Sequence, residues 1–69
     1  MNVKVYMSEI INSRAVELLN FLDEGDISYE VERVGTEWVG AHKVKFLPVV
    51  EIDGKLIVAK KAMKKLKRG

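Results

Sequence analysis

The sequence predicts an α/β fold in which a β-α-β unit is followed by two more strands and a final helix. Three observations support this order. Apolar and polar residues alternate over residues 3–7 and again over 27–32, as expected for strands. Apolar residues between these segments recur at helical spacing. Near the carboxyl end, Asp53-Gly54 separates two apolar runs, and Pro48 opens the first, a pattern typical of a hairpin with a two-residue turn. We therefore expect a four-stranded mixed sheet.

The first half of the chain accounts for the β-α-β unit. The helix between the strands has its apolar residues on one face: Ile11, Ala15, Leu18, Leu19 and Leu22. Ser8 or Asn12 can cap its start with a side-chain oxygen, and Gly25 is expected to end it in the left-handed conformation. A strand, a helix and a strand of these lengths predict parallel pairing with a right-handed crossover.

The second half begins at Gly35, where the pattern breaks. Residues 36–45 show no clean period and include another glycine, so we expect a short, imperfect helix or an irregular connection. The hairpin covers residues 48–58. The final helix is expected over residues 59–68, with its apolar side chains on one face and lysines on the other: Ala59, Ala62, Met63 and Leu66.

Composition limits the possible functions. The 69 residues are expected to form one domain, residues 1–69, and they include no cysteine, which excludes a thiol nucleophile, a disulfide and a thiolate metal site. No apolar run approaches the roughly 20 residues of a membrane span, and residues 1–5 lack a signal-peptide pattern. We therefore expect a cytoplasmic protein with no membrane contact. Glutamine is absent while Lys, Glu, Val and Ile are plentiful, a composition resembling that of thermophile proteins.

Charge is distributed unevenly along the chain. Residues 1–34 carry three basic and seven acidic side chains, whereas residues 35–69 carry nine basic and three acidic ones. Since both halves are expected to fold together, the surface should be dipolar.

The order of elements, together with several short segments, resembles the glutaredoxin-like branch of the thioredoxin fold. The most specific segment is Leu47-Pro48-Val49-Val50-Glu51-Ile52-Asp53-Gly54-Lys55, and weaker matches occur at residues 5–6, 15–19 and 27–30. The resemblance implies a sheet of order 2-1-3-4, with the first and last helices on one face. It also implies a cis peptide bond before Pro48.

The chain departs from this family at the residues that carry its chemistry. Glutaredoxins have a CxxC or CxxS motif before the first helix, where the helix dipole stabilises a thiolate. Here, Glu9 and Asn12 occupy the two cysteine positions. The Gly-Gly and acidic residue of members that bind glutathione are replaced by Val58-Ala59-Lys60-Lys61. Thiol–disulfide exchange by this chain alone is therefore excluded, and no cofactor is expected.

Other catalytic and metal sites have weak support. Ser8 and Ser13 could act as nucleophiles only beside a positioned base, and the single histidine, His42, is distant in sequence. Helix capping explains these serines more simply. Asp23, Glu24 and Asp26 lack the ligand spacing of a calcium loop, so we expect a solvated helix end and no metal site.

The leading hypothesis is a non-catalytic binding or protein-interaction module. Its site would contain residues of the loop before the first helix and of the proline loop: Ser8, Glu9, Asn12, Trp38, Leu47 and Pro48. The backbone at Leu47 could pair with an extended peptide as an added strand. Trp38 either packs on the second face of the sheet or anchors the ligand. The sequence names no particular peptide or protein partner.

Two alternatives remain. A basic patch on the final helix could bind nucleic acid; its residues are Lys60, Lys61, Lys64, Lys65, Lys67 and Arg68. The same residues are also explained as the solvated face of an amphipathic helix, and no aromatic residue lies among them for base stacking. A less favoured alternative is a component of a redox system whose thiols lie on a partner.

We expect the purified protein to be inactive in disulfide reduction with glutathione or dithiothreitol as donor, because the reaction proceeds by thiolate attack. Turnover of a disulfide substrate above the uncatalysed rate would contradict this. A Glu9→Cys/Asn12→Cys double variant is expected to gain a reactive pair, measured by its reaction with a thiol-specific chromophore.

Overall fold

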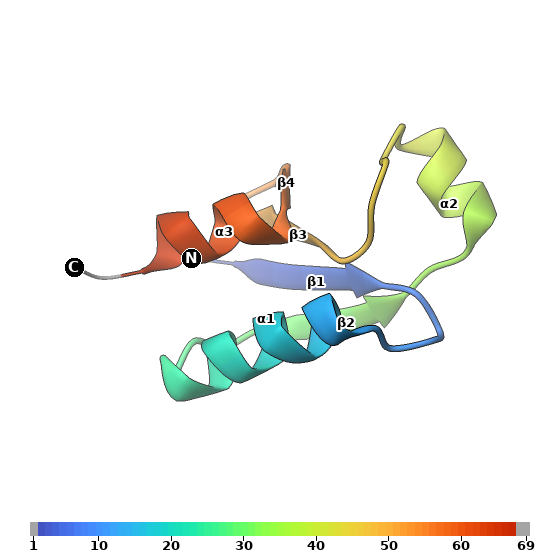
Figure 1. Cartoon of the computed structure of the whole chain (residues 1–69). Helices are drawn as coiled ribbons and strands as arrows, with labels where there is room; N and C mark the ends of the chain where they lie inside the picture. Colours follow the sequence, from blue (N-terminus) through green and yellow to red (C-terminus); the bar gives the residue numbers. More distant parts are fainter. Residues whose placement is uncertain (1, 68–69) are drawn as a thin grey trace.

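The computed structural model describes residues 2–67 and contains a mixed four-stranded sheet of order β2-β1-β3-β4 (Figure 1). β1 is parallel to β2 and antiparallel to β3, and β3 is antiparallel to β4. This is the α/β fold and strand order expected from the sequence. The strands are β1 (Val3–Met7), β2 (Glu30–Arg33), β3 (Val49–Ile52) and β4 (Lys55–Val58).

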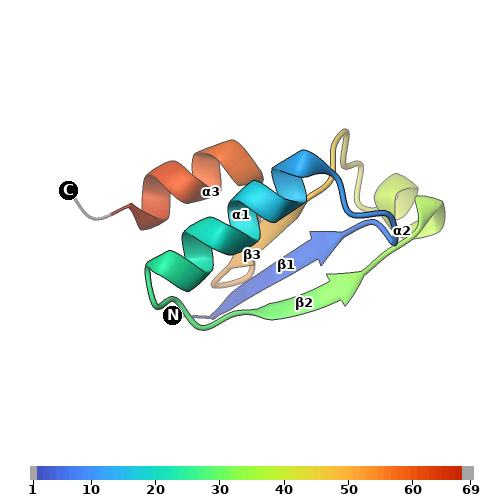
Figure 2. The same cartoon turned by 60° about the horizontal axis from the view of Figure 1, so that its bottom comes forward.

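Two helices, α1 (Ser13–Glu24) and α3 (Ala59–Leu66), lie side by side on one face of the sheet (Figure 2). A third helix, α2 (Thr36–Ala41), lies beyond the carboxyl ends of β1 and β2. It occupies the segment expected to be a short helix or an irregular connection. None of these helices is long and apolar enough to cross a membrane.

The main core fills the space between the sheet and the two helices. Val5 and Val50 project from the central strands, and Leu18 and Leu22 project from α1; all four side chains are fully buried. α3 adds Ala59, Ala62 and Leu66, so its buried face has the predicted helical spacing. Because these residues come from both halves of the chain, this core joins the β-α-β unit to the hairpin.

The hairpin turn has the geometry predicted for Asp53-Gly54. Both residues have positive φ, 49° and 87°, and a two-residue turn of this kind matches the twist of the strands that it joins. Ile52 and Lys55 pair directly on either side of it. The turn therefore fixes the register of β3 and β4.

The end of α1 differs from the prediction. Gly25 has φ −86°, and Asp26 instead takes the left-handed conformation, with φ 53°. Aspartate tolerates this region better than most residues. The Ile27 N–H then donates to the Leu22 carbonyl at 3.0 Å. This bond closes the helix end, and β2 begins only at Glu30, three residues later than expected.

We expect Leu18→Ala to lower the free energy of unfolding by about 2–5 kcal/mol, because it removes a fully buried side chain and leaves a cavity. Denaturant unfolding followed by circular dichroism measures this change. Val16→Ala is the matched control, since Val16 lies on the same helix and is 48% exposed. It should change stability by less than about 0.5 kcal/mol, and equal effects of the two substitutions would contradict the packing described.

Candidate binding cleft beside Pro48

The proline loop lies between the start of α1 and the start of β3. The Leu47–Pro48 peptide bond is cis, and the Pro48 side chain is buried. Asn12 connects this loop to α1. Its Oδ1 accepts a hydrogen bond from the Ala15 N–H at 2.8 Å, which caps the helix, and its Nδ2 donates to the Leu47 carbonyl at 3.4 Å. One side chain thus sets the position of the helix start relative to the proline loop.

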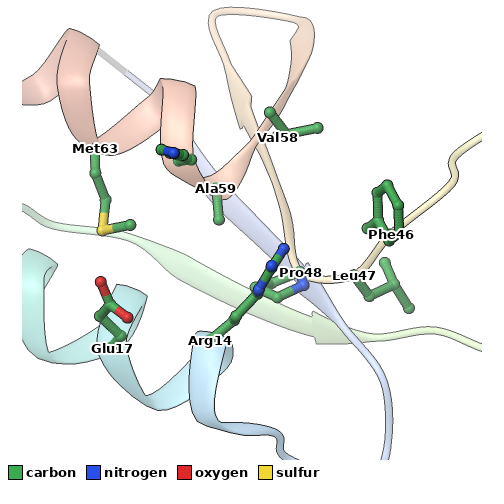
Figure 3. A pocket seen from close by; sticks show the side chains of 9 residues that line it. Arg14, Glu17, Phe46, Leu47, Pro48, Val58, Ala59 and Met63 are labelled. Carbon is green, nitrogen blue, oxygen red and sulfur yellow. The ribbon is translucent and has the colours of Figure 1, made fainter.

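A cleft of about 410 Å³ opens beside Pro48. Its walls come from α1, from the segment before β3, and from the junction of β4 with α3 (Figure 3). Glu17 and Met63 lie at one end, Phe46 and Leu47 at the other, and Arg14 extends toward Pro48 between them. The residues that line it are Arg14, Glu17, Phe46, Leu47, Pro48, Val58, Ala59, Lys60 and Met63.

Exposed apolar side chains form one end of the cleft. Phe46 is 65% exposed and Val58 is 43% exposed, whereas side chains of this type are usually buried. The charged lining residues are two cations, Arg14 and Lys60, and one carboxylate, Glu17. The cleft therefore combines an apolar surface with a few charged groups, a composition typical of binding sites.

The six residues predicted to form a binding site are only partly brought together. Leu47 and Pro48 line the cleft, and Asn12 bonds to Leu47. Glu9 is exposed in the loop before α1, and the Ser8 hydroxyl donates to the Ile10 carbonyl. Neither residue lines the cleft.

Trp38 takes the packing position that was one of its two predicted roles. Its ring stacks on Tyr6, with the centroids 4.5 Å apart, and belongs to a second apolar cluster that includes Val49 and Leu47. This cluster lies on the sheet face opposite α1 and α3. Leu47 thus contributes to both the cleft and the cluster around Trp38.

Sequence reasoning missed most of the residues that line the cleft: Arg14, Glu17, Phe46, Val58, Ala59 and Met63. Arg14 and Glu17 are separated by three positions, and Met63 lies on the neighbouring helix, so the pairing of α1 with α3 brings them together. Residues three apart share a helix face. This spacing, combined with the expected arrangement of both helices on one face, was the signal that could have identified Arg14, Glu17 and Met63.

The histidine does not act as a base for either serine in the structure. His42 stacks on Trp38, with ring centroids 4.1 Å apart, and its Nδ1 lies 2.9 Å from the Trp38 carbonyl oxygen. Within residues 2–67, no group of three His, Cys, Asp or Glu side chains is placed to hold a metal ion.

Tyrosine hydroxyls are held by carboxylates on two surfaces outside the cleft. Tyr6 donates to Glu51 at 3.1 Å, and Tyr29 donates to Asp23 at 2.9 Å. Burial, followed by the bond to Glu51, raises the pKa of Tyr6; the bond to Asp23 is the main cause that raises the pKa of Tyr29. Both hydroxyls therefore stay protonated near neutral pH and act as hydrogen-bond donors.

The basic patch follows the exposed face of α3 and the residue after it. Lys60, Lys61, Lys64, Lys65 and Lys67 are exposed, whereas the opposite face of α3 is buried in the main core. Arg68, the sixth predicted member, lies outside the described residues. Lys60 also lines the cleft, so the basic patch and the cleft meet at the first turn of α3.

Comparisons with known proteins identify the fold. No family model matches the sequence, and no curated protein matches it. Among solved structures, the chain is similar to the glutathione S-transferase from Ascaris lumbricoides, with a TM-score of 0.72 and 20% sequence identity. The similarity covers 96% of this chain and 34% of the transferase, so this chain spans about a third of the transferase's length. Together with the strand order, this likeness shows that the chain has a thioredoxin-like fold.

Proposed function

We propose that this chain is a non-catalytic interaction module whose cleft beside Pro48 binds an extended segment of a partner protein. The observation that carries the proposal is the combination of exposed apolar walls and a loop backbone that no strand pairs with, at one place. Phe46 and Val58 offer apolar area. Leu47 lies beyond the last strand pair, Tyr6 with Val49, so the β1–β3 ladder does not extend to its backbone groups.

The shape of the cleft favours an extended segment over a compact ligand. Pro48 and Arg14 lie in its middle, with Met63 toward one end and Phe46 toward the other (Figure 3). A peptide in this cleft can form backbone hydrogen bonds with Leu47 and place one side chain against Phe46 and another against Met63. The similarity to a glutathione S-transferase also makes glutathione, itself a short peptide, a useful probe.

The absence of cysteine argues for binding without thiol chemistry. A sulfur nucleophile is needed for disulfide exchange, and the chain has none. Asn12, which the resemblance to glutaredoxins aligns with a cysteine, caps α1 and contacts the proline loop. Its amide holds the loop through hydrogen bonds and supplies no redox chemistry.

Nucleic-acid binding by the basic patch is the competing function. It requires only exposed cations, which the patch supplies, and its affinity would fall steeply with salt. Binding in the cleft depends instead on apolar contact, which salt affects little. Salt dependence and the location of the bound ligand therefore separate the two functions.

We expect five-residue peptides selected from a random library on the immobilised protein to shift the backbone amide signals of Asn12, Leu47 and Lys60. Phe46→Ala should weaken their binding about fivefold, or about 1 kcal/mol, because it removes an apolar wall. Amide shift mapping by NMR measures both effects. Val16→Ala is the control, because Val16 is also an exposed apolar residue but lies on α1 and does not line the cleft.

Two results would contradict the proposed function. One is shifts confined to the lysines of α3 on addition of an oligonucleotide, with none near Pro48 for any selected peptide or for glutathione. The other is equal peptide affinity of the wild-type protein and Phe46→Ala.

A further inference from the structure

We infer that the free edge of β4 is a second interaction surface, which accepts an acidic strand from a partner protein. Within residues 2–67, β4 pairs only with β3, so one side of its backbone has no partner strand. The backbone of this edge is separate from that of Leu47, but Val58 and Lys60 also line the cleft. Amide shifts at Leu56, which does not line the cleft, therefore distinguish the two sites.

The register of the hairpin shows which backbone groups face outward. Ile52 pairs with Lys55 next to the two-residue turn, and Asp53 donates its N–H to the Asn2 carbonyl at 3.1 Å, on the β1 side. Hydrogen-bonding residues alternate along an antiparallel ladder. Leu56 and Val58 therefore direct their N–H and carbonyl groups away from β3, toward the free edge.

The side chains at this edge present different chemistry on the two faces of the sheet. Leu56 and Val58, 38% and 43% exposed, lie on the face opposite α1 and α3. On the helix-bearing face, Lys55 lies at one end of β4 and the first turn of α3, with Lys60 and Lys61, follows the other end. An added strand would thus meet apolar residues on one face and cations on the other.

This arrangement selects an acidic partner strand over a second copy of the chain. Two copies pairing antiparallel through Leu56 and Val58 would bring Lys55 of one copy close to the first turn of α3 of the other. Like charges at such a contact are unfavourable, and lysine on an edge strand opposes self-pairing. A strand that alternates apolar and acidic residues would instead cover Leu56 and Val58 and place its carboxylates beside these lysines.

Val58 allows a sharp test because its backbone already fits proline. Its φ is −63°, close to the value that a proline ring fixes. Val58→Pro removes the outward N–H while leaving the hydrogen bonds between β3 and β4 intact. Val58→Ala is the matched control, since it shortens the side chain but retains the N–H.

The probe is an acetylated and amidated seven-residue peptide of alternating glutamate and valine, compared with the same peptide carrying lysine for glutamate. The acidic peptide should bind at least about tenfold more tightly and shift and protect the Leu56 and Val58 amides. Val58→Pro should weaken binding about tenfold, and Val58→Ala less than about threefold. Lys55→Glu should reduce the preference for the acidic peptide. NMR titration and amide exchange measure these changes.

Several outcomes would overturn the inference. They are equal affinity for the two peptides, equal effects of Val58→Pro and Val58→Ala, or shifts only at Asn12 and Leu47, which would place the peptide in the cleft. Sedimentation could also show a concentration-dependent dimer of the wild-type protein that is absent for Val58→Pro. This result would identify a second copy as the occupant and would overturn the inference. If Val58→Pro fails to give a native spectrum, amide protection in the wild-type protein and the Lys55→Glu result decide the question.

Discussion

The packing of α1 and α3 against the two central strands is the interaction on which the rest of this structure depends. Val5 and Val50 come from two strands that are distant in sequence, and Leu18 and Leu22 of α1 cover both side chains. A chain of 69 residues without cysteine has no disulfide to hold its halves together. Burial of this apolar layer therefore joins the β-α-β unit to the hairpin, and it also sets where the ends of the two helices lie.

The cleft is a consequence of this packing. Because both helices lie on one face of the sheet (Figure 2), the first turns of α1 and α3 approach Pro48 from two sides. Asn12 then fixes the proline loop to α1 through its bond to the Leu47 carbonyl. Apolar side chains, Phe46 and Val58 above all, remain exposed around this junction beside the charged Arg14, Glu17 and Lys60. Exposed apolar patches of this kind are typical of surfaces that bind another protein.

The fold could be predicted largely from patterns that are local in sequence. Alternation identified β1, and Asp53-Gly54 identified the hairpin because few residues other than glycine, asparagine and aspartate adopt its positive φ angles. The end of α1 was less predictable, since Gly25 and Asp26 can both take the left-handed conformation and the chain uses Asp26. The start of β2 was misjudged for a related reason: Ile27 bonds to Leu22 and closes the helix before any strand pairing begins.

The cleft was harder to predict because its residues meet only in three dimensions. Leu47 and Pro48 were found through the proline loop, but Arg14 and Met63 contribute only because α1 and α3 are neighbours. For Trp38, the sequence left open packing on the second face of the sheet and anchoring of a ligand. Its ring stacks on Tyr6 in the apolar cluster on that face, which agrees with the packing role.

The most direct test of binding in the cleft is a solution structure of the protein with a selected peptide, determined from intermolecular nuclear Overhauser effects. The predicted result is a set of nuclear Overhauser effects between the peptide and the side chains of Phe46, Leu47 and Met63, with the peptide extended along the cleft. Effects found only with the exposed lysines of α3, or none to any residue that lines the cleft, would contradict it.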